Sequence, residues 1–190
     1  MGLFDVLFGK TKPAKTKVDP LFAMTTAHVT LLTRYDLKPT GKAAVAFRPV
    51  SSSFFDEARK ELEDLLHVGE KTSGTAYTLS TDEFGYIWVL LEDLEFEDLV
   101  TGVYQVSETL KDHGFQDRLL AAVFPFAPEG GGDKLYWIYA YKHGAFYPFA
   151  PRGDRQRDNA LELRQSAVMN EELPVLQDKT QWFAFWGLPL

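Results

Sequence analysis

The sequence predicts an α+β protein in which an antiparallel sheet is built from β-hairpin–helix units and the helices pack on the sheet. From residue 53 onward, paired segments with strand patterns alternate with segments of helical periodicity. Residues 86–91 and 135–141 are apolar at nearly every position, which is typical of strands covered on both faces. The composition, 45% hydrophobic and 25% charged over 190 residues, is that of a globular domain.

The first pair of strands is expected at residues 29–35 and 43–48, joined across a Pro-Thr-Gly turn at 39–41. In the second strand, alternate apolar residues share one face: Ala43, Val45 and Phe47.

A helix is predicted over residues 53–67, with Ser53 as its N-cap and Gly69 just beyond its end. Apolar side chains recur there at helical spacing and are expected to face inward: Phe54, Phe55, Ala58, Leu62, Leu65 and Leu66.

The second unit pairs residues 76–80 with residues 86–91 in a hairpin, and a helix over 95–113 follows it. Gly114 ends that helix. Six apolar residues of the helix are expected to face inward: Phe96, Leu99, Val100, Val103, Val106 and Leu110.

The third unit pairs residues 119–126 with residues 135–142 through a glycine-rich turn. A loop over 143–153 leads to a helix from about 154 to 172, with Asp154 as its N-cap.

Two regions follow from this pattern. Residues 1–20 form an amphipathic segment and a basic linker, and residues 21–190 form a single α+β domain with an aromatic tail. The tail, residues 181–190, holds four aromatic side chains and must pack on the same chain or on a partner.

Charge is unevenly distributed along the chain. The net charge is −7, and residues 53–100 alone carry 3 basic and 13 acidic side chains, a net charge of −10. This acidic region argues against a nucleic acid as the partner. The sequence has no cysteine, which excludes thiol catalysis and cysteine-ligated metals and fits a cytoplasmic location.

The N-terminal segment is the sharpest local feature. Its apolar side chains would share one face of a short helix, and lysines follow directly; the residues concerned are Leu3, Phe4, Leu7, Phe8, Lys10 and Lys12. So short a helix is unstable alone in water. We therefore expect it to bind an anionic membrane surface, which would make the protein peripheral at the inner face of the membrane, or a partner's groove. The alternative is packing on its own domain.

Candidate chemistry is sparse. The four histidines lie in separate segments, and the carboxylates at 92–98 match no metal-loop spacing and fit a solvated helix start. Three arginines near a predicted helix start suggest an anion site: Arg152, Arg155 and Arg157. The alternative is that these arginines pair with Asp154 and Asp158.

Three stretches resemble the PspA-associated protein family PspAB: residues 1–12 (MGLFDVLFGKTK), 141–163 (YKHGAFYPFAPRGDRQRDNALEL) and 182–187 (WFAFWG). The resemblance implies a non-enzymatic accessory of a phage-shock-type envelope stress response. It implies a PspA-like protein or an HtpX-like membrane metalloprotease as partner, and it implies no cofactor or catalytic residue. The order of elements from residue 53 is also similar to that of type III secretion chaperones and YbjN-like proteins.

Three functions are compatible with the sequence. The first is an adaptor whose aromatic loop contacts a protein partner, with these residues: His143, Phe146, Tyr147, Phe149, Arg152 and Arg155. For the three loop aromatics the alternative is packing onto the core. The second is a chaperone-like module that holds an extended client segment and needs an exposed apolar patch. The third is a binder of a small anionic ligand, which needs a deep polar pocket.

Overall fold

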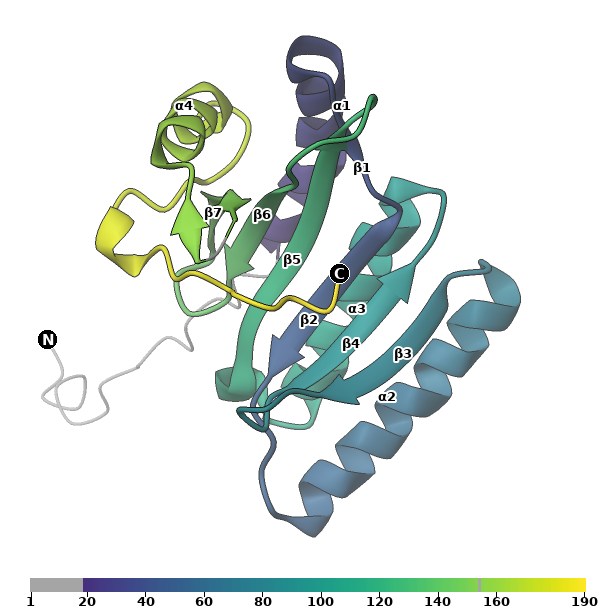
Figure 1. Ribbon diagram of the computed structural model, residues 1–190. Helices are drawn as coiled ribbons and strands as arrows, with labels where there is room; N and C mark the ends of the chain where they lie inside the picture. Colours follow the sequence, from purple (N-terminus) through teal and green to yellow (C-terminus); the bar gives the residue numbers. More distant parts are fainter. Residues whose placement is uncertain (1–18, 154) are drawn as a thin grey trace, which may run out of the picture.

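The computed structural model describes residues 19–153 and 155–190, and within them seven strands form one antiparallel sheet (Figure 1). The order across the sheet is β3-β4-β2-β5-β6-β7, and β1 pairs with the end of β5. The strands are β1 (Leu37–Pro39), β2 (Lys42–Phe47), β3 (Ala76–Thr81), β4 (Ile87–Glu92), β5 (Leu119–Pro128), β6 (Leu135–Ala140) and β7 (Ala145–Phe149). A small hairpin of β8 (Pro151–Arg152) and β9 (Gln156–Arg157) stands apart. The α+β class and the antiparallel sheet are thus confirmed.

Helices cover one face of this sheet (Figure 1). They are α1 (Met24–Tyr35), α2 (Ser53–Thr72) and α3 (Phe96–Asp112), while α4 (Asn159–Met169) packs beside β7. Short 3-10 turns lie at Asp19–Ala23, Gln116–Arg118 and Lys179–Gln181.

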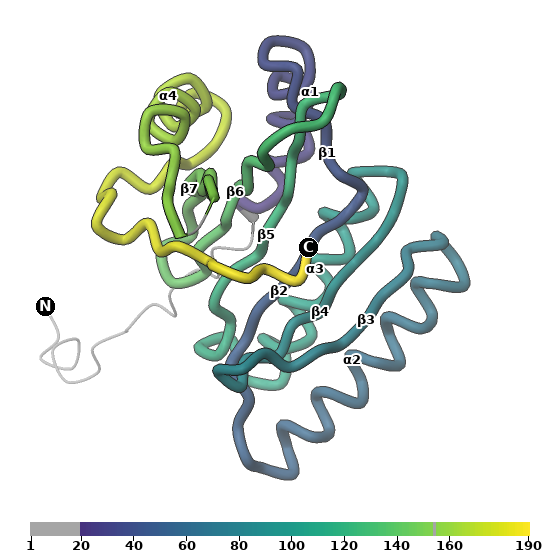
Figure 2. Tube along the Cα trace, in the orientation of Figure 1, coloured from purple at the N-terminus to yellow at the C-terminus, as the bar shows by residue number. Residues whose placement is uncertain are grey.

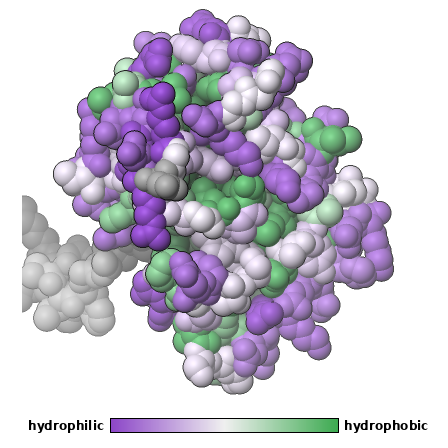
Figure 3. All heavy atoms as spheres, in the orientation of Figure 1, coloured by the Kyte–Doolittle hydropathy of each residue, from purple (hydrophilic) through white to green (hydrophobic). Residues whose placement is uncertain are grey.

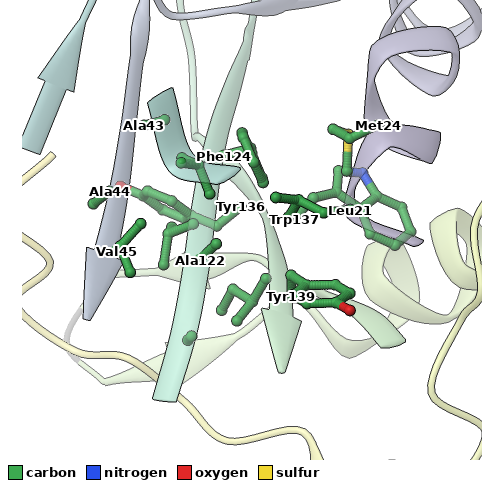
Figure 4. Close-up of a cluster of buried hydrophobic side chains, with 14 of the residues drawn as sticks. Leu21, Met24, Ala43, Ala44, Val45, Ala122, Phe124, Tyr136, Trp137 and Tyr139 are labelled. Carbon is green, nitrogen blue, oxygen red and sulfur yellow. The ribbon is translucent and has the colours of Figure 1, made fainter. Parts of the chain in front are cut away.

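The main core lies between the sheet and the helices. Phe47 of β2 contacts Phe55 of α2 at 6.2 Å between ring centroids, and all six residues predicted to face inward from α3 are buried. In Figure 4, Trp137 of β6 lies close to Leu21, in the 3-10 turn before α1, and to Met24, the first residue of α1. The inward face predicted for residues 95–113 is therefore confirmed.

The strand predicted at residues 29–35 is wrong, because these residues form the second half of helix α1. Their β-branched side chains favour a strand locally. The helix instead buries Met24, Ala27 and Leu31 at helical spacing, and the Thr33 hydroxyl donates to the Val29 carbonyl at 2.8 Å. Burial in the core thus outweighs local propensity. The first strand is β1, which pairs with β5 instead of β2.

The boundaries of two helices also differ from prediction. Helix α2 has Ser52 as its N-cap, whose Oγ accepts from the Phe55 N–H at 3.2 Å, and it runs through Gly69 to Thr72. Helix α4 begins at Asn159 with Asp158 as its N-cap, because the β8–β9 hairpin occupies the residues before it. Two side chains predicted to face inward from α2 are exposed: Phe54 and Leu65.

The C-terminal residues cross the sheet face opposite to α1, α2 and α3, seen as the yellow trace in Figure 2. Trp182 stacks on Tyr147 at 6.3 Å between centroids, and Trp186 meets Phe149 at 5.1 Å. The Lys134 ammonium donates to the Leu190 carbonyl at 3.0 Å. Figure 3 shows apolar residues gathered at the centre of this face. The aromatic tail therefore packs on its own chain.

Candidate functional site

The three arginines of the predicted anion site lie in different surroundings. Arg157 is engaged inside the fold, where its Nε donates to Glu162 at 2.9 Å and its Nη1 donates to the Trp182 carbonyl at 2.6 Å. Arg152 is exposed, 3.7 Å from Asp158. Arg155 is exposed in the turn between β8 and β9, with φ of 52°. Arg157 therefore serves the fold and is not free to hold an anion together with Arg152 and Arg155.

Glu162 is the partner that sequence reasoning missed. It is 2% exposed, it accepts from the Ala150 N–H at 2.8 Å, and the Arg157 Nη2 lies 2.9 Å from its Oε2. The Arg157 guanidinium also lies 5.3 Å from the Phe149 ring centroid. One ion pair between β9 and α4 thus also contacts Phe149 of β7 and the C-terminal tail. The spacing of five residues gives no periodic signal that would reveal it.

The aromatic loop predicted to contact a partner is the strand β7. Phe146, Tyr147 and Phe149 are all buried, and the Tyr147 hydroxyl donates to the Phe183 carbonyl at 3.1 Å. Burial raises the pKa of Tyr147 well above its usual range. Tyr147 and Phe149 pack against Trp182 and Trp186 of the C-terminal tail, and Phe146 packs against Tyr139 of β6. These three rings are therefore not free to contact a partner, and the alternative of core packing holds. His143 is half-buried.

The carboxylates near residue 93 are used locally. The Asp93 carboxylate accepts from the Glu95 N–H at 2.9 Å and from the Thr75 hydroxyl, and Lys42 lies 2.7 Å from Glu92. In the described part of the chain, no three histidine, aspartate or glutamate side chains are grouped to hold a metal ion.

A cavity of about 130 Å³ lies between α2 and α3, with Asp98, Thr72 and Thr101 among its lining residues. Its charged lining residue is an acid, which does not suit an anionic ligand.

The outer strand β3 is the most accessible part of the sheet. It pairs with β4 along its whole length, from Ala76 opposite Glu92 to Thr81 opposite Ile87, and forms one end of the strand order. Its six residues contain neither a charged side chain nor a proline. Lysine, proline, a bulge or a covering helix or loop is the usual protection of a sheet edge against further pairing. This edge carries no lysine, proline or bulge, and helix α2 borders it across a hollow.

The opposite edge of the sheet is closed. The N–H of Phe146 on β7 donates to the Pro174 carbonyl at 2.8 Å, and the N–H of Leu176 donates to the Phe146 carbonyl at 2.7 Å. Residues 174–176 thus continue the sheet beyond β7 as a short parallel bridge. The β7 edge of the sheet is therefore paired with another segment, whereas the β3 edge has no strand beyond it.

An acidic helix borders the open edge. Figure 1 shows α2 running alongside β3, and hydrophilic residues predominate over this part of the surface in Figure 3. Glu63 and Glu70 of α2, together with Tyr77, Thr78 and Leu79 of β3, line a shallow open hollow between the helix and the strand. The edge and this hollow form the candidate partner-binding surface.

The residues predicted for membrane or partner contact in the N-terminal segment lie outside the described residues: Leu3, Phe4, Leu7, Phe8, Lys10 and Lys12. Between residues 19 and 190, leaving aside residue 154, no helix has the length and apolar character needed to cross a membrane.

Comparison with known proteins identifies the family of the chain. The family model for PspAB, described as PspA associated protein B, matches residues 1–190, the whole chain. The chain belongs to the PspAB family. The name of PspAB links the family to PspA, which fits an accessory role. No curated protein and no solved structure matches the chain. The similarity in element order to type III secretion chaperones and YbjN-like proteins therefore stays a prediction.

Proposed function

We propose that this PspAB protein is a non-enzymatic accessory of a PspA-type envelope stress response and that it acts as an adaptor by binding a PspA-like protein. The observation that carries the proposal is the family match along all 190 residues. An HtpX-like membrane metalloprotease is the second partner class within the same proposal. The described fold supports an adaptor because it offers an unpaired strand edge without charge or proline beside an acidic helix.

Attachment to the membrane is a separate part of the proposal. The apolar residues at 3–8 would insert at the interface, and each lysine that follows would add about 1 kcal/mol near an anionic surface. Such attachment is weak and reversible for one short segment. It would place the protein at the inner face of the membrane while the domain binds its partner.

The two alternative functions have less support. The chaperone-like alternative needs an exposed apolar patch on the sheet or the helices, and the sheet face opposite the helices is covered by the chain's own aromatic tail. The anionic-ligand alternative needs convergent basic groups, but Arg157 is paired with Glu162. Both observations favour an adaptor.

The direct test is binding of the purified chain to a purified PspA-like protein from the same genome, measured by isothermal titration calorimetry. We expect saturable binding with a Kd of roughly 0.1–10 μM, the range of regulatory contacts of modest size. A variant that lacks residues 1–18 serves as the comparison. Equal binding by both places the partner contact in residues 19–190, whereas binding by the intact chain alone places it in the N-terminal segment.

Absence of binding by both chains at 100 μM would refute a PspA-like partner. Repeating the titration with the soluble domain of an HtpX-like protease would then decide whether any part of the adaptor proposal survives.

A further inference from the structure

We propose that the open edge of β3 binds an extended, basic segment of a protein partner by β-strand addition. This inference rests on the proposed adaptor function and names the surface and the chemistry of the contact. Adding a strand satisfies backbone groups at a sheet edge, and side-chain pockets beside the edge select the sequence.

A hydrogen bond at the hairpin turn shows which residues of β3 turn their N–H and C=O groups to the open edge. The Asp82 N–H donates to the Tyr86 carbonyl at 3.0 Å, which makes these opposite residues a hydrogen-bonded pair of the β3–β4 hairpin. Hydrogen-bonded and non-bonded pairs alternate in an antiparallel ladder. With the observed register, Tyr77, Leu79 and Thr81 are non-bonded with β4 and turn their N–H and C=O groups to the open edge.

The neighbouring pair of strands confirms this phase. The Asp93 N–H donates to the Gly41 carbonyl at 3.0 Å, so odd-numbered residues of β4 bond to β2 and even-numbered residues bond to β3. The edge therefore presents three donors and three acceptors over six residues. Among the described residues, no side chain donates to or accepts from these outward groups.

The hollow beside the edge sets the side-chain preference. Glu63 and Glu70 of α2 border it, each about half exposed, while Tyr77 and Leu79 line its strand side. Within α2, one oxygen of Glu63 lies 3.0 Å from Arg59 and one oxygen of Glu70 lies 3.5 Å from His67. A strand added to β3 would place alternate side chains beneath α2. Lysine or arginine at those positions would reach the two carboxylates, and apolar residues between them would face the other side.

Charge also decides between a partner and a second copy of this chain. Residues 53–100 include α2, β3 and β4 and carry a net charge of −10. Pairing two copies through β3 would bring two such regions together, which is unfavourable at ordinary ionic strength. A basic strand is attracted to this acidic region, whereas a second copy of the chain is repelled by it. The occupant is therefore a basic segment of another protein.

The test uses the full chain and a synthetic probe, acetyl-Thr-Lys-Val-Lys-Val-Lys-Thr-amide, with the same peptide carrying glutamate for lysine as its counterpart. Residue-resolved amide hydrogen exchange is measured by NMR with and without 1 mM peptide. We expect exchange to slow at least tenfold at Tyr77, Leu79 and Thr81, with little change at Thr78 and Ser80, which already bond to β4. An unchanged exchange rate at the three outward amides would overturn the proposal, as would equal binding of the acidic peptide.

Two double variants of equal charge test the role of the hollow. Replacing Glu63→Lys and Glu70→Lys should weaken peptide binding about tenfold, the effect of losing and reversing two exposed ion pairs. Replacing Glu57→Lys and Asp64→Lys changes the net charge equally and keeps the seven-residue spacing, but on a part of α2 outside the hollow. Equal weakening by the two pairs would mean only general attraction and would overturn the site.

The same variants separate this inference from the adaptor proposal. If a PspA-like protein binds the parent chain and the E63K/E70K variant equally well, the adaptor function stands and strand addition at β3 is refuted. If the basic peptide slows exchange at the β3 edge but no PspA-like protein binds the chain, strand addition stands and a PspA-like partner is refuted.

Discussion

Replacing Arg157 by methionine is expected to destabilise the fold by about 3–5 kcal/mol, the cost of removing one partner of a buried ion pair. Methionine fills a similar apolar volume against Phe149 but donates no hydrogen bond. The Glu162 carboxylate, 2% exposed, would keep only the Ala150 N–H as a donor. The Trp182 carbonyl would lose its partner as well.

The measurement is urea unfolding followed by tryptophan fluorescence, supported by calorimetric melting. For a chain of this length, each kcal/mol lowers Tm by about 2–4 °C, so a fall of roughly 6–20 °C is expected. Arg152→Met is the matched control, because that arginine is exposed and lies 3.7 Å from its acidic neighbour. The control should change stability by less than about 0.5 kcal/mol.

A double variant isolates the buried charge. Adding Glu162→Leu to Arg157→Met removes the stranded carboxylate, so the double variant should be more stable than Arg157→Met alone. A cost of less than about 1 kcal/mol for Arg157→Met, or a double variant less stable than Arg157→Met alone, would refute a stabilising role for this ion pair.

Three further predictions concern other parts of the chain. Trp88→Ala should cost about 3–5 kcal/mol in urea unfolding, because the side chain is buried in β4 against Phe185; a change under about 1 kcal/mol would contradict its interior position. Tyr147→Phe should lose stability at pH 7 but approach the parent above pH 10. Burial raises the pKa of Tyr147, so the parent's stability is present below pH 10 and is lost, by about 1.4 kcal/mol per pH unit, as only the unfolded chain ionises. A constant gap between pH 7 and pH 11 would disprove this. Phe4→Asp or Leu7→Asp should abolish binding to anionic liposomes while shifting Tm by less than about 1 °C; a large loss of stability would instead mean that the segment belongs to the core.

Local pattern and tertiary contact contributed differently to the fold. The helix predicted over residues 95–113 matches Phe96–Asp112, because its apolar stripe and its ending glycine are local signals. The hairpin of β3 and β4 is likewise set by two strand patterns around a short turn. The strand predicted over residues 29–35 was wrong because their β-branched residues favour a strand locally, whereas burial of one helix face in the core favours a helix.

The candidate site was less accessible to sequence reasoning. A hairpin pattern does not tell which of its strands lies at the edge, since that depends on β2, more than 30 residues earlier, pairing with β4. Nor does it reveal that residues 174–176 close the other edge. The acidic charge of residues 53–100 was visible, but its place beside an open strand was not.

The sequence by itself determined the α+β class, the family, the acidic middle region and most helices and strands, because each of these depends on residues close together in the chain or on whole-chain similarity. Only the tertiary structure decided that Phe146 and Phe149 are core, that Arg157 holds Glu162, and that β3 keeps an open edge. These three features depend on contacts between segments that are distant in the sequence. Burial of apolar surface and pairing of buried charges stabilise such contacts and can outweigh local propensity.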